Sequence, residues 1–285
     1  MNVDIRPMTA ADIPECGRIC FEAFEAIARS HNFPPDFPSV AVATDLVSSL
    51  VAHPGFFSVV AESDGRVVGS NFLDERGPIF SVGPVTVDPK MQNSQVGRAL
   101  MAAVLQRSAQ RDAVGVRLVQ MAYHNRSMSL YAKLGFDVRE PLATLQGHPV
   151  ASPIHGYPVR PATDDDVKAC NALCSSVHGH DRGGELSDAV AQGTAQLVER
   201  GNRITGYTSD IGLFGHAVAE TNDDLVALIA AASEFSGPGF LVPMRNTDLL
   251  RWCLEQRLRV VHMDNLMTTG FYREPNGAFL ASVGY

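Results

Sequence analysis

The alternation of hydrophobic and polar positions predicts a strand, a turn and a helix between residues 82 and 105. The β-branched run Val85-Thr86-Val87 is typical of a strand, and Asp88-Pro89 ends it because proline restricts the residue before it. After a polar turn, apolar residues recur at helical spacing from Val96 onward. The first turn of such a helix offers backbone N–H groups and the positive end of the dipole, which together favour an anion. A phosphate-bearing ligand and an ordinary strand–turn–helix packed on a sheet fit this pattern equally well.

Other elements follow from the same kind of pattern. Residues 56–62 and 66–73 alternate as two strands of a hairpin around the turn Ser63-Asp64-Gly65. Residues 116–123 predict a further strand, which leads into a helical segment from residue 127 to 134.

The opening of the chain is repeated near its middle. The stretch Arg6-Pro7-Met8-Thr9-Ala10-Ala11-Asp12 is echoed by Arg160-Pro161-Ala162-Thr163-Asp164-Asp165-Asp166. Each copy predicts a short strand followed by a helix that the threonine caps, because Thr-x-x-Asp is a variant of the capping box. Residues 147–158 are rich in Gly and Pro and so mark a linker. We therefore expect two copies of one fold, in domains 1–146 and 159–285.

Composition and charge narrow the classes of function. The 285 residues are 45% hydrophobic and 19% charged, which is typical of a globular protein with room for two domains. A net charge of −8 argues against a nucleic-acid or membrane partner, because both need a basic face, and it favours cationic acceptors such as amines. No apolar run approaches a membrane span, and the first residues lack the apolar core of a signal peptide. We expect a soluble, cytoplasmic protein.

The cysteines raise the question of a metal site. Four of the five form two pairs at i, i+4 spacing, which are Cys16 with Cys20 and Cys170 with Cys174. Zinc would need further Cys or His ligands, and His178 and His180 are the one hint of them. Cysteines buried in the core are the favoured interpretation, and no metal site is predicted. The odd total also fits the reduced thiols of a cytoplasm.

The strand–turn–helix segment resembles the acetyl-CoA loop of the GCN5-related N-acetyltransferase (GNAT) family, in which a strand precedes Gln/Arg-x-x-Gly-x-Gly/Ala. Here Gln92-Asn93-Ser94-Gln95-Val96-Gly97 matches the first glutamine and the last glycine. It departs at the middle glycine, whose place Gln95 takes. In the family that position lies against the pyrophosphate, so this side chain either obstructs the ligand or hydrogen-bonds to it.

A second segment strengthens the resemblance. Residues 124–136 resemble the family signature Asn-x-x-Ala-x-x-Leu-Tyr-x-Lys-x-Gly-Phe, with Gly135 as the helix C-cap. Tyr131 falls on the tyrosine that, in the family, donates a proton to the departing CoA thiolate. The family asparagine falls on His124, with Asn125 beside it.

The resemblance implies an α/β (α+β) protein of two tandem GNAT-like domains, each a mixed, mainly antiparallel sheet flanked by helices. It implies an N-acetyltransferase, active in its first domain, that moves an acetyl group from acetyl-CoA as co-substrate, with no metal, to a primary amine of a small molecule or peptide by direct attack. A homodimer is a further possibility. The residues implied in acetyl-CoA binding are Val85, Thr86, Val87, Gln92, Asn93, Ser94, Gln95, Val96, Gly97, Arg98, Ala99, Asn125, Ser127 and Tyr131.

The same resemblance leaves the catalytic base open. Tyr131 is the implied acid. The central strand, within Phe80 to Val87, contains no carboxylate that could serve as the base. His124 has a suitable ordinary pKa and is the candidate base, while Asp74, Glu75 or a chain of water molecules would also serve.

The second copy has lost the cofactor features. It places Asp223 and Asp224 where a pyrophosphate would lie, and these carboxylates would repel phosphate. Cys253 replaces the acid tyrosine, so we expect no acetyl-CoA chemistry there. Its expected role is to pack against the first half and close the acceptor pocket, and the tail from residue 269 either reaches that pocket or forms a closing hairpin. The alternative function is a non-catalytic acyl-CoA-binding or structural GNAT-fold protein whose cofactor site Gln95 has weakened.

Overall fold

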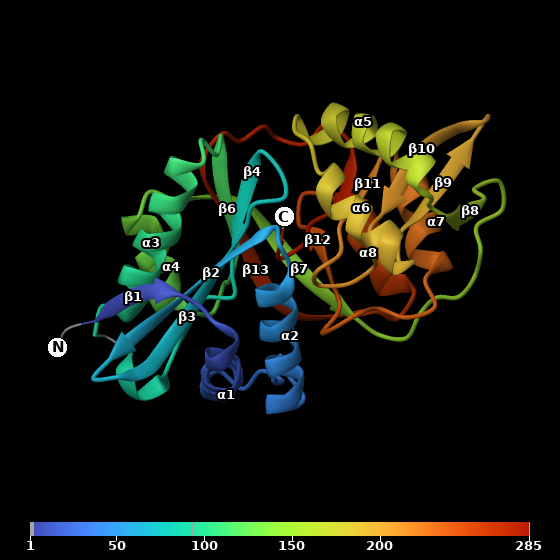
Figure 1. Ribbon diagram of the computed structural model, residues 1–285. Helices are drawn as coiled ribbons and strands as arrows, with labels where there is room; N and C mark the ends of the chain where they lie inside the picture. Colours follow the sequence, from blue (N-terminus) through green and yellow to red (C-terminus); the bar gives the residue numbers. More distant parts are fainter. Residues whose placement is uncertain (1–2, 93, 285) are drawn as a thin grey trace. The chain divides into compact units, whose positions relative to one another are not determined.

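The computed structural model describes residues 3–92 and 94–284 of the chain. These residues form two compact units. The first unit comprises Met1–Arg117 and Ser129–Leu134, and the second comprises Leu118–Met128 and Gly135–Tyr285. Both are mixed structures of mainly antiparallel sheet and helices, which confirms the predicted fold class (Figure 1).

The first unit is built on consecutive antiparallel strands. Its strands and helices are β1 (Asp4–Pro7), α1 (Ile13–Ser30), α2 (Val40–Ala52), β2 (Phe56–Ser63), β3 (Arg66–Asp74), β4 (Ile79–Val82), β5 (Thr86–Val87) and α3 (Val96–Gln110). Strand β2 pairs with β1 and β3, which confirms the predicted hairpin. Strand β6 (Gly115–Met121) begins in this unit, where its first residues pair in parallel with β4. Helix α4 (Asn125–Lys133) then carries Tyr131.

The second unit contains a five-stranded antiparallel sheet in the order β14-β11-β10-β9-β8. Its elements are β8 (Val159–Pro161), α5 (Val167–His178), α6 (Gly183–Gln192), β9 (Gln196–Arg200), β10 (Arg203–Thr208), β11 (Ala217–Ala219), α7 (Asn222–Ala231), β12 (Phe240–Pro243), α8 (Thr247–Glu255), β13 (Arg259–Gly270) and β14 (Ala278–Leu280). A large hydrophobic core joins α7 and α8 to these strands.

Strand β7 (Asp137–Gln146) also belongs to the second unit. It pairs antiparallel with β12 on one edge and with β13 on the other. It precedes the predicted linker in the sequence, whereas both of its neighbours follow that linker. The boundaries of the compact units thus differ from those of the predicted domains 1–146 and 159–285. The predicted domains describe the sequence repeat and stay a prediction.

The repeated opening of the chain has the same local structure in both copies. In the first copy, Thr9 and Asp12 form a capping box, and both Nη atoms of Arg6 lie 2.8 Å from the Asp12 carboxylate. In the second copy, Thr163 and Asp166 form the same box, and both Nη atoms of Arg160 lie 2.8 Å from Asp166. Each arginine also binds a glutamate of the next strand, Glu62 at 2.9 Å and Glu199 at 2.7 Å. The predicted caps are confirmed, each on a single 3₁₀ turn that leads into the long helix.

The paired cysteines lie in hydrophobic cores, as predicted. Cys16 and Cys20 pack with α2 and β3 residues, and Cys170 and Cys174 pack with α6 and β10 residues. Burial raises the pKa of Cys16, Cys20 and Cys170 to about 12. In the described ranges, no group of three His, Cys, Asp or Glu side chains is arranged to hold a metal ion.

Two further observations bear on the predictions. Within residues 3–92 and 94–284, no helix is both long enough and apolar enough to cross a bilayer. The Pro- and Phe-rich loop after α1 covers the first unit's core, because the Phe37 ring packs edge-on against Phe24 with 5.4 Å between centroids.

Candidate active site

Strand β5 is the predicted ligand strand of the first unit. It pairs with β3 through Gly69 opposite Val87 and Ser70 opposite Thr86. Thr86 is buried, and its hydroxyl lies 2.9 Å from that of Ser70. A Cβ on Gly69 would lie 2.6 Å from the carbonyl oxygen of Thr86, so only glycine allows this approach. Among the described strands, β5 pairs with β3 alone, which leaves its other edge for an extended ligand.

The turn after β5 is held by short-range hydrogen bonds. Asp88 caps the 3₁₀ turn η2 (Pro89–Met91), because its Oδ1 accepts the N–H of Lys90 at 2.9 Å. Gln92 is extended and half-buried, and the Ser94 hydroxyl donates to the carbonyl of Met91. Asn93, also predicted to bind the cofactor, lies outside the described residues.

Gln95 takes a left-handed conformation, which glycine adopts most easily. It is the N-cap of α3, with φ of 68° and ψ of 2°, and its side chain is exposed. A residue with a Cβ pays about 1–2 kcal/mol in this conformation relative to the right-handed one. The backbone at Gln95 is therefore strained relative to a glycine in the same conformation.

Replacing Gln95 with glycine is expected to raise the free energy of unfolding by about 0.5–1 kcal/mol. Glycine relieves the left-handed strain, and this gain exceeds the cost of the additional chain entropy that glycine loses on folding. Denaturation by urea measures the change. Gln95→Ala is the matched control, since it removes the side chain and keeps the strain. An equal gain from both variants would show that the side chain, not the conformation, is responsible.

The first turn of α3 supplies the groups that an anion needs. Val96 is buried, whereas Gly97 and Ala99 are half-buried and Arg98 is exposed. The Ala99 N–H already bonds to the Gln95 carbonyl at 3.0 Å, and a helix leaves the N–H groups before it without an intrahelical acceptor. Arg98 forms no ion pair with any residue that the structure describes, so its charge is available to a phosphate.

Gly97 brings three elements of the first unit together. A Cβ at this position would lie 3.5 Å from Cδ2 of Leu130 and 3.7 Å from Cγ2 of Val87. The open-edged strand, the first turn of α3 and the helix that carries Tyr131 therefore meet at one point. Tyr131 is buried, and burial raises the pKa of its hydroxyl to about 12. It thus holds its proton at neutral pH.

The remaining predicted residues lie at the start of α4, in the part of the chain that belongs to the second unit. The Nδ1 atom of His124 lies 3.3 Å from the N–H of Ser127, and the Ser127 hydroxyl donates to the His124 carbonyl at 2.9 Å. Asn125 is exposed. His124 therefore caps this helix through Nδ1.

The two carboxylates at the end of β3 are engaged by arginines. Asp74 lies 2.5 Å from Arg76, and Glu75 lies 2.7 Å from Arg107. Both carboxylates are thus already engaged in ion pairs within the first unit.

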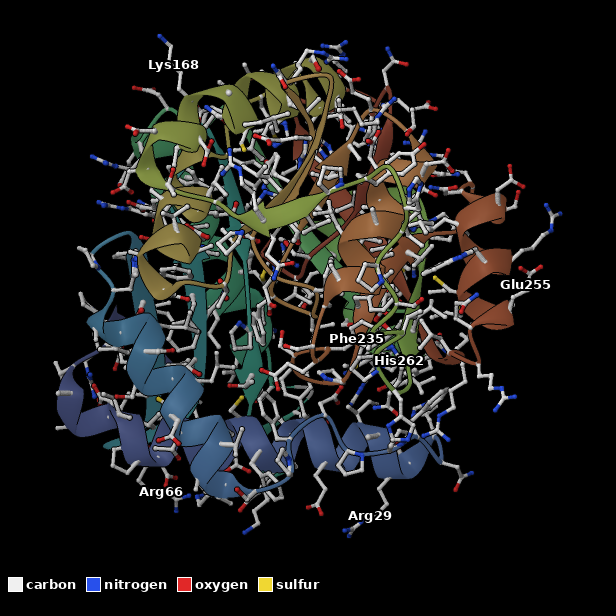
Figure 2. The ribbon with its side chains drawn as sticks, turned by 90° about the vertical axis from the view of Figure 1, so that its right-hand side faces the viewer. Arg29, Arg66, Lys168, Phe235, Glu255 and His262 are labelled. Atoms are coloured by element: carbon white, nitrogen blue, oxygen red, sulfur yellow. The ribbon has the colours of Figure 1, made fainter. Side chains whose placement is uncertain are left out.

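Sequence reasoning missed two buried polar clusters of the second unit. Nδ1 of His262, labelled in Figure 2, lies 3.0 Å from Oδ2 of Asp264, which also accepts from the Thr144 hydroxyl at 2.8 Å. Near the start of α6, a carboxylate oxygen of Glu185 lies 2.6 Å from Arg182 and 3.3 Å from Nδ1 of His216. The i, i+2 spacing of His262 and Asp264 within an apolar strand indicates the first cluster, because it places both side chains on one face of the strand.

The segment around α7, which is predicted to lack a cofactor loop, is held by internal hydrogen bonds. Thr221 caps α7, and the buried Asp224 binds Arg200 at 2.8 Å and the Thr205 hydroxyl at 2.6 Å. Burial works to raise the pKa of Asp224, but its hydrogen bonds with Arg200 and the two threonines hold that pKa below its usual value. Cys253, in place of the acid tyrosine, is fully buried in the core. The side chains of Thr221 and Asp224 at the start of α7 thus form hydrogen bonds within the protein.

Part of the chain is similar to known proteins in sequence. Residues 21–136 match the acetyltransferase (GNAT) family. Mycothiol acetyltransferase of Kocuria rhizophila is 36% identical over 93 residues, which cover 29% of this chain and 30% of that enzyme. The chain thus matches less than a third of this curated relative's length.

Solved structures share the fold over nearly the whole chain. A candidate acetyltransferase from Pyrococcus horikoshii has a TM-score of 0.76 at 18% identity and covers 99% of this chain and 96% of its own. A GCN5-related N-acetyltransferase from Sphaerobacter thermophilus has a TM-score of 0.64 at 15% identity, with 95% and 96% covered.

Residues 21–136 are therefore the part of the chain that is similar to the GNAT acetyltransferase family. It contains β5, the first turn of α3 and Tyr131, which are the elements that meet at Gly97.

Proposed function

We propose that this protein is an N-acetyltransferase that uses acetyl-CoA and acetylates a primary amine of a small molecule or peptide, with the active site in its first half. The observation that carries the proposal is the meeting of β5, the α3 N-terminus and the Tyr131 helix at Gly97, inside the segment that matches the family. The chemistry of these groups fits acetyl-CoA: an open strand edge for the pantetheine amides, and N–H groups with Arg98 for the pyrophosphate.

The proposed reaction is a direct attack. The acceptor nitrogen forms a bond to the thioester carbonyl carbon while the carbon–sulfur bond breaks, and the sulfur leaves as a thiolate. A backbone N–H near Val87 would polarise the carbonyl, and Tyr131 would give its proton to the thiolate. The second proton, which the acylated nitrogen loses as it becomes an amide, would restore the Tyr131 hydroxyl. His124 is the proposed acceptor of the proton from the incoming ammonium, taken on Nδ1.

We propose further that the second half is a degenerate copy of the first. The matching arginine–aspartate pairs, the matching capping boxes and the shared order of elements support a duplication. Asp223 and Asp224 at the start of α7 oppose a pyrophosphate there, so the activity is assigned to the first half.

One observation favours the alternative of a non-catalytic acyl-CoA-binding protein. Gln95 adds a side chain at the loop position where the family keeps glycine. A binder would retain affinity for acetyl-CoA and release no CoA with any amine.

The first test is calorimetric titration of acetyl-CoA into the protein. We expect micromolar binding, about −8 kcal/mol. Gly97→Glu is expected to weaken this binding at least about tenfold, because a carboxylate in the first turn of α3 repels the pyrophosphate while suiting the helix dipole. Gln106→Glu is the matched control, since it adds the same charge at an exposed position on the same helix. Absence of binding to the unaltered protein and to Gln95→Gly would refute the acetyl-CoA assignment.

A further inference from the structure

The two halves of the chain follow the same order of elements. The first half runs β1, α1, α2, β2, β3, β4 and β5, α3, β6, α4, β7, and the second runs β8, α5, α6, β9, β10, β11, α7, β12, α8, β13. By this order, β11 corresponds to the β4–β5 segment, and β12 corresponds to β6. Strand β14 is the addition, and in the described part of the first half nothing corresponds to it.

Strand β14 lies between β11 and β12. It pairs antiparallel with β11, placing Val218 opposite Phe279 and Ala217 opposite Leu280. One residue further on, the N–H of Ala281 donates to the carbonyl of Leu241 in β12 at 3.2 Å. The C-terminal segment therefore fills the space between β11 and β12, which correspond by order to the β4–β5 segment and to β6.

The corresponding strand edges differ between the halves. In the first half, β5 pairs with β3 on one edge, and the described strands leave its other edge open. In the second half, β11 pairs with β10 on one edge and with β14 on the other. A pantetheine arm would use this second edge, because an extended ligand bonds to the backbone of a strand edge.

The segment is held firmly in this place. Phe279 and Ser282 are buried, and the Ser282 hydroxyl lies 3.1 Å from Nη2 of the buried Arg182. Gly277 takes a φ of 150°, and a Cβ there would lie 2.9 Å from the carbonyl oxygen of Ala219. The backbone thus enters the space between the strands in close contact with β11.

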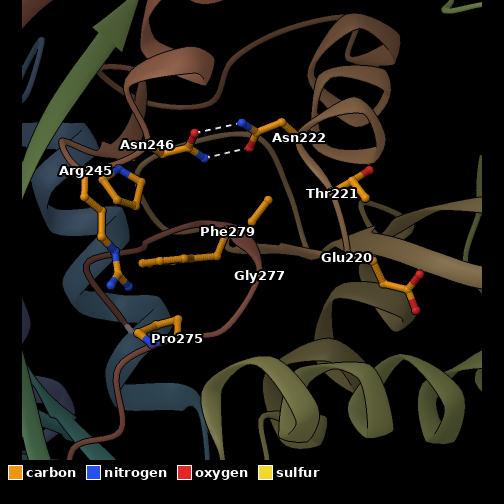
Figure 3. A pocket seen from close by; sticks show the side chains of 10 residues that line it. Glu220, Thr221, Asn222, Arg245, Asn246, Pro275, Gly277 and Phe279 are labelled. Carbon is orange, nitrogen blue, oxygen red and sulfur yellow. Dashed lines mark hydrogen bonds between the residues drawn. The ribbon is translucent and has the colours of Figure 1, made fainter.

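A small cavity remains at the entrance to this space. It has a volume of about 360 Å³ and lies where β11 and β12 end and α7 and α8 begin (Figure 3). Asn222 and Asn246 bond across it through their side-chain amides, at 2.9 and 2.8 Å. Phe279 and Pro275 of the C-terminal segment form part of its wall. The cavity therefore ends at the segment.

We infer that residues 277–282 occupy, in the second half, the place that the pantetheine arm takes in the first, and so close the second half to acetyl-CoA. Each chain then binds one acetyl-CoA. The expected number of one acetyl-CoA per chain rests on the proposed function, because it requires the site in the first half. The closure of the second half is tested by a separate measurement.

The experiment combines two measurements on the full chain. Native mass spectrometry counts acetyl-CoA bound to the unaltered protein, to Gly97→Glu and to Gln106→Glu. At a concentration of acetyl-CoA close to the Kd of the unaltered protein, we expect at most one molecule on the unaltered protein and on Gln106→Glu, and a fraction bound at least about fivefold lower on Gly97→Glu. Hydrogen exchange of the peptide 277–282 is followed with and without saturating acetyl-CoA. We expect exchange slowed at least about a hundredfold relative to an unstructured peptide, because its amides are paired and buried, and no change on adding acetyl-CoA.

Three results separate the inference from the proposed function. Two molecules bound to the unaltered protein, or one bound to Gly97→Glu with undiminished affinity, would overturn the inference. Rapid exchange of the peptide, or exchange that accelerates with acetyl-CoA, would also overturn it. No binding by the unaltered protein, with the peptide still protected, would refute the proposed function and leave the second half closed as inferred.

Discussion

Replacing Tyr131 with phenylalanine is expected to lower kcat at least about 100-fold, the usual contribution of a positioned general acid. Affinity for acetyl-CoA is expected to stay unchanged, because the Tyr131 ring is buried and phenylalanine preserves its packing. The hydroxyl is protonated throughout the neutral range, since burial raises its pKa to about 12. Steady-state release of CoA with an accepted amine gives kcat, and calorimetry gives the affinity.

A matched variant controls for the loss of a tyrosine hydroxyl. Tyr157 donates to Asp223 at 2.9 Å in the second unit, so Tyr157→Phe is expected to leave kcat unchanged. An unchanged kcat in Tyr131→Phe would remove the acid role from this residue. A fall in kcat accompanied by lost acetyl-CoA affinity would instead assign the hydroxyl to binding.

Replacing Glu185 with glutamine is expected to lower the free energy of unfolding by about 3–5 kcal/mol, because breaking a buried ion pair leaves one charge uncompensated. The remaining charge belongs to Arg182, whose side chain is 2% exposed and whose Nη2 lies 2.6 Å from the carboxylate. Glutamine has nearly the same shape, so the change removes charge without opening a cavity. Urea denaturation measures the difference.

The pH dependence of the same variant gives a second readout. Burial works to raise the pKa of Glu185, but the neighbouring Arg182 and His216 outweigh it and hold that pKa below its usual value. A carboxylate with a depressed pKa in the folded state stabilises the fold above its unfolded pKa of about 4.3, and this contribution is lost as the pH falls below it. The unaltered protein should therefore lose stability on acidification more steeply than Glu185→Gln.

A surface pair provides the control for this stability change. Glu199 binds Arg160 at 2.7 Å, but its side chain is 36% exposed. Glu199→Gln is expected to cost less than about 1 kcal/mol, since water and salt screen such a pair. Equal losses in both glutamine variants would show that burial of the Arg182–Glu185 pair adds nothing.

Local signals explain what the sequence could predict. The Thr9–Asp12 box, the hairpin before the central strand and the start of α3 each depend on residues within a few positions of one another. The assignment of the cofactor loop and of Tyr131 to one acetyl-CoA site depended on resemblance to a family and stays a prediction, whereas the approach of Leu130 to Gly97 comes from the structure.

The features that escaped prediction depend on partners far apart in the sequence. Strand β14 follows β11 by about sixty residues, and no periodicity indicates which strand edge a three-residue strand will join. Arg182 and Ser282 are likewise brought together only by the fold. The left-handed backbone at Gln95 was hidden because glutamine gives no local signal for it.

The position of β7 has a consequence for how this chain can be divided. Four of its residues, from Leu142 to Leu145, are fully buried, and both of its edges bond to strands that come later in the sequence. A fragment ending at Gln146 would carry this strand with two bare edges, a template for aggregation. Cleavage in the loop that follows would leave the pieces interlaced through backbone hydrogen bonds. A fragment cut after Gln146 is thus not a module that can be used alone, because β7 needs the later strands β12 and β13 to cover its edges.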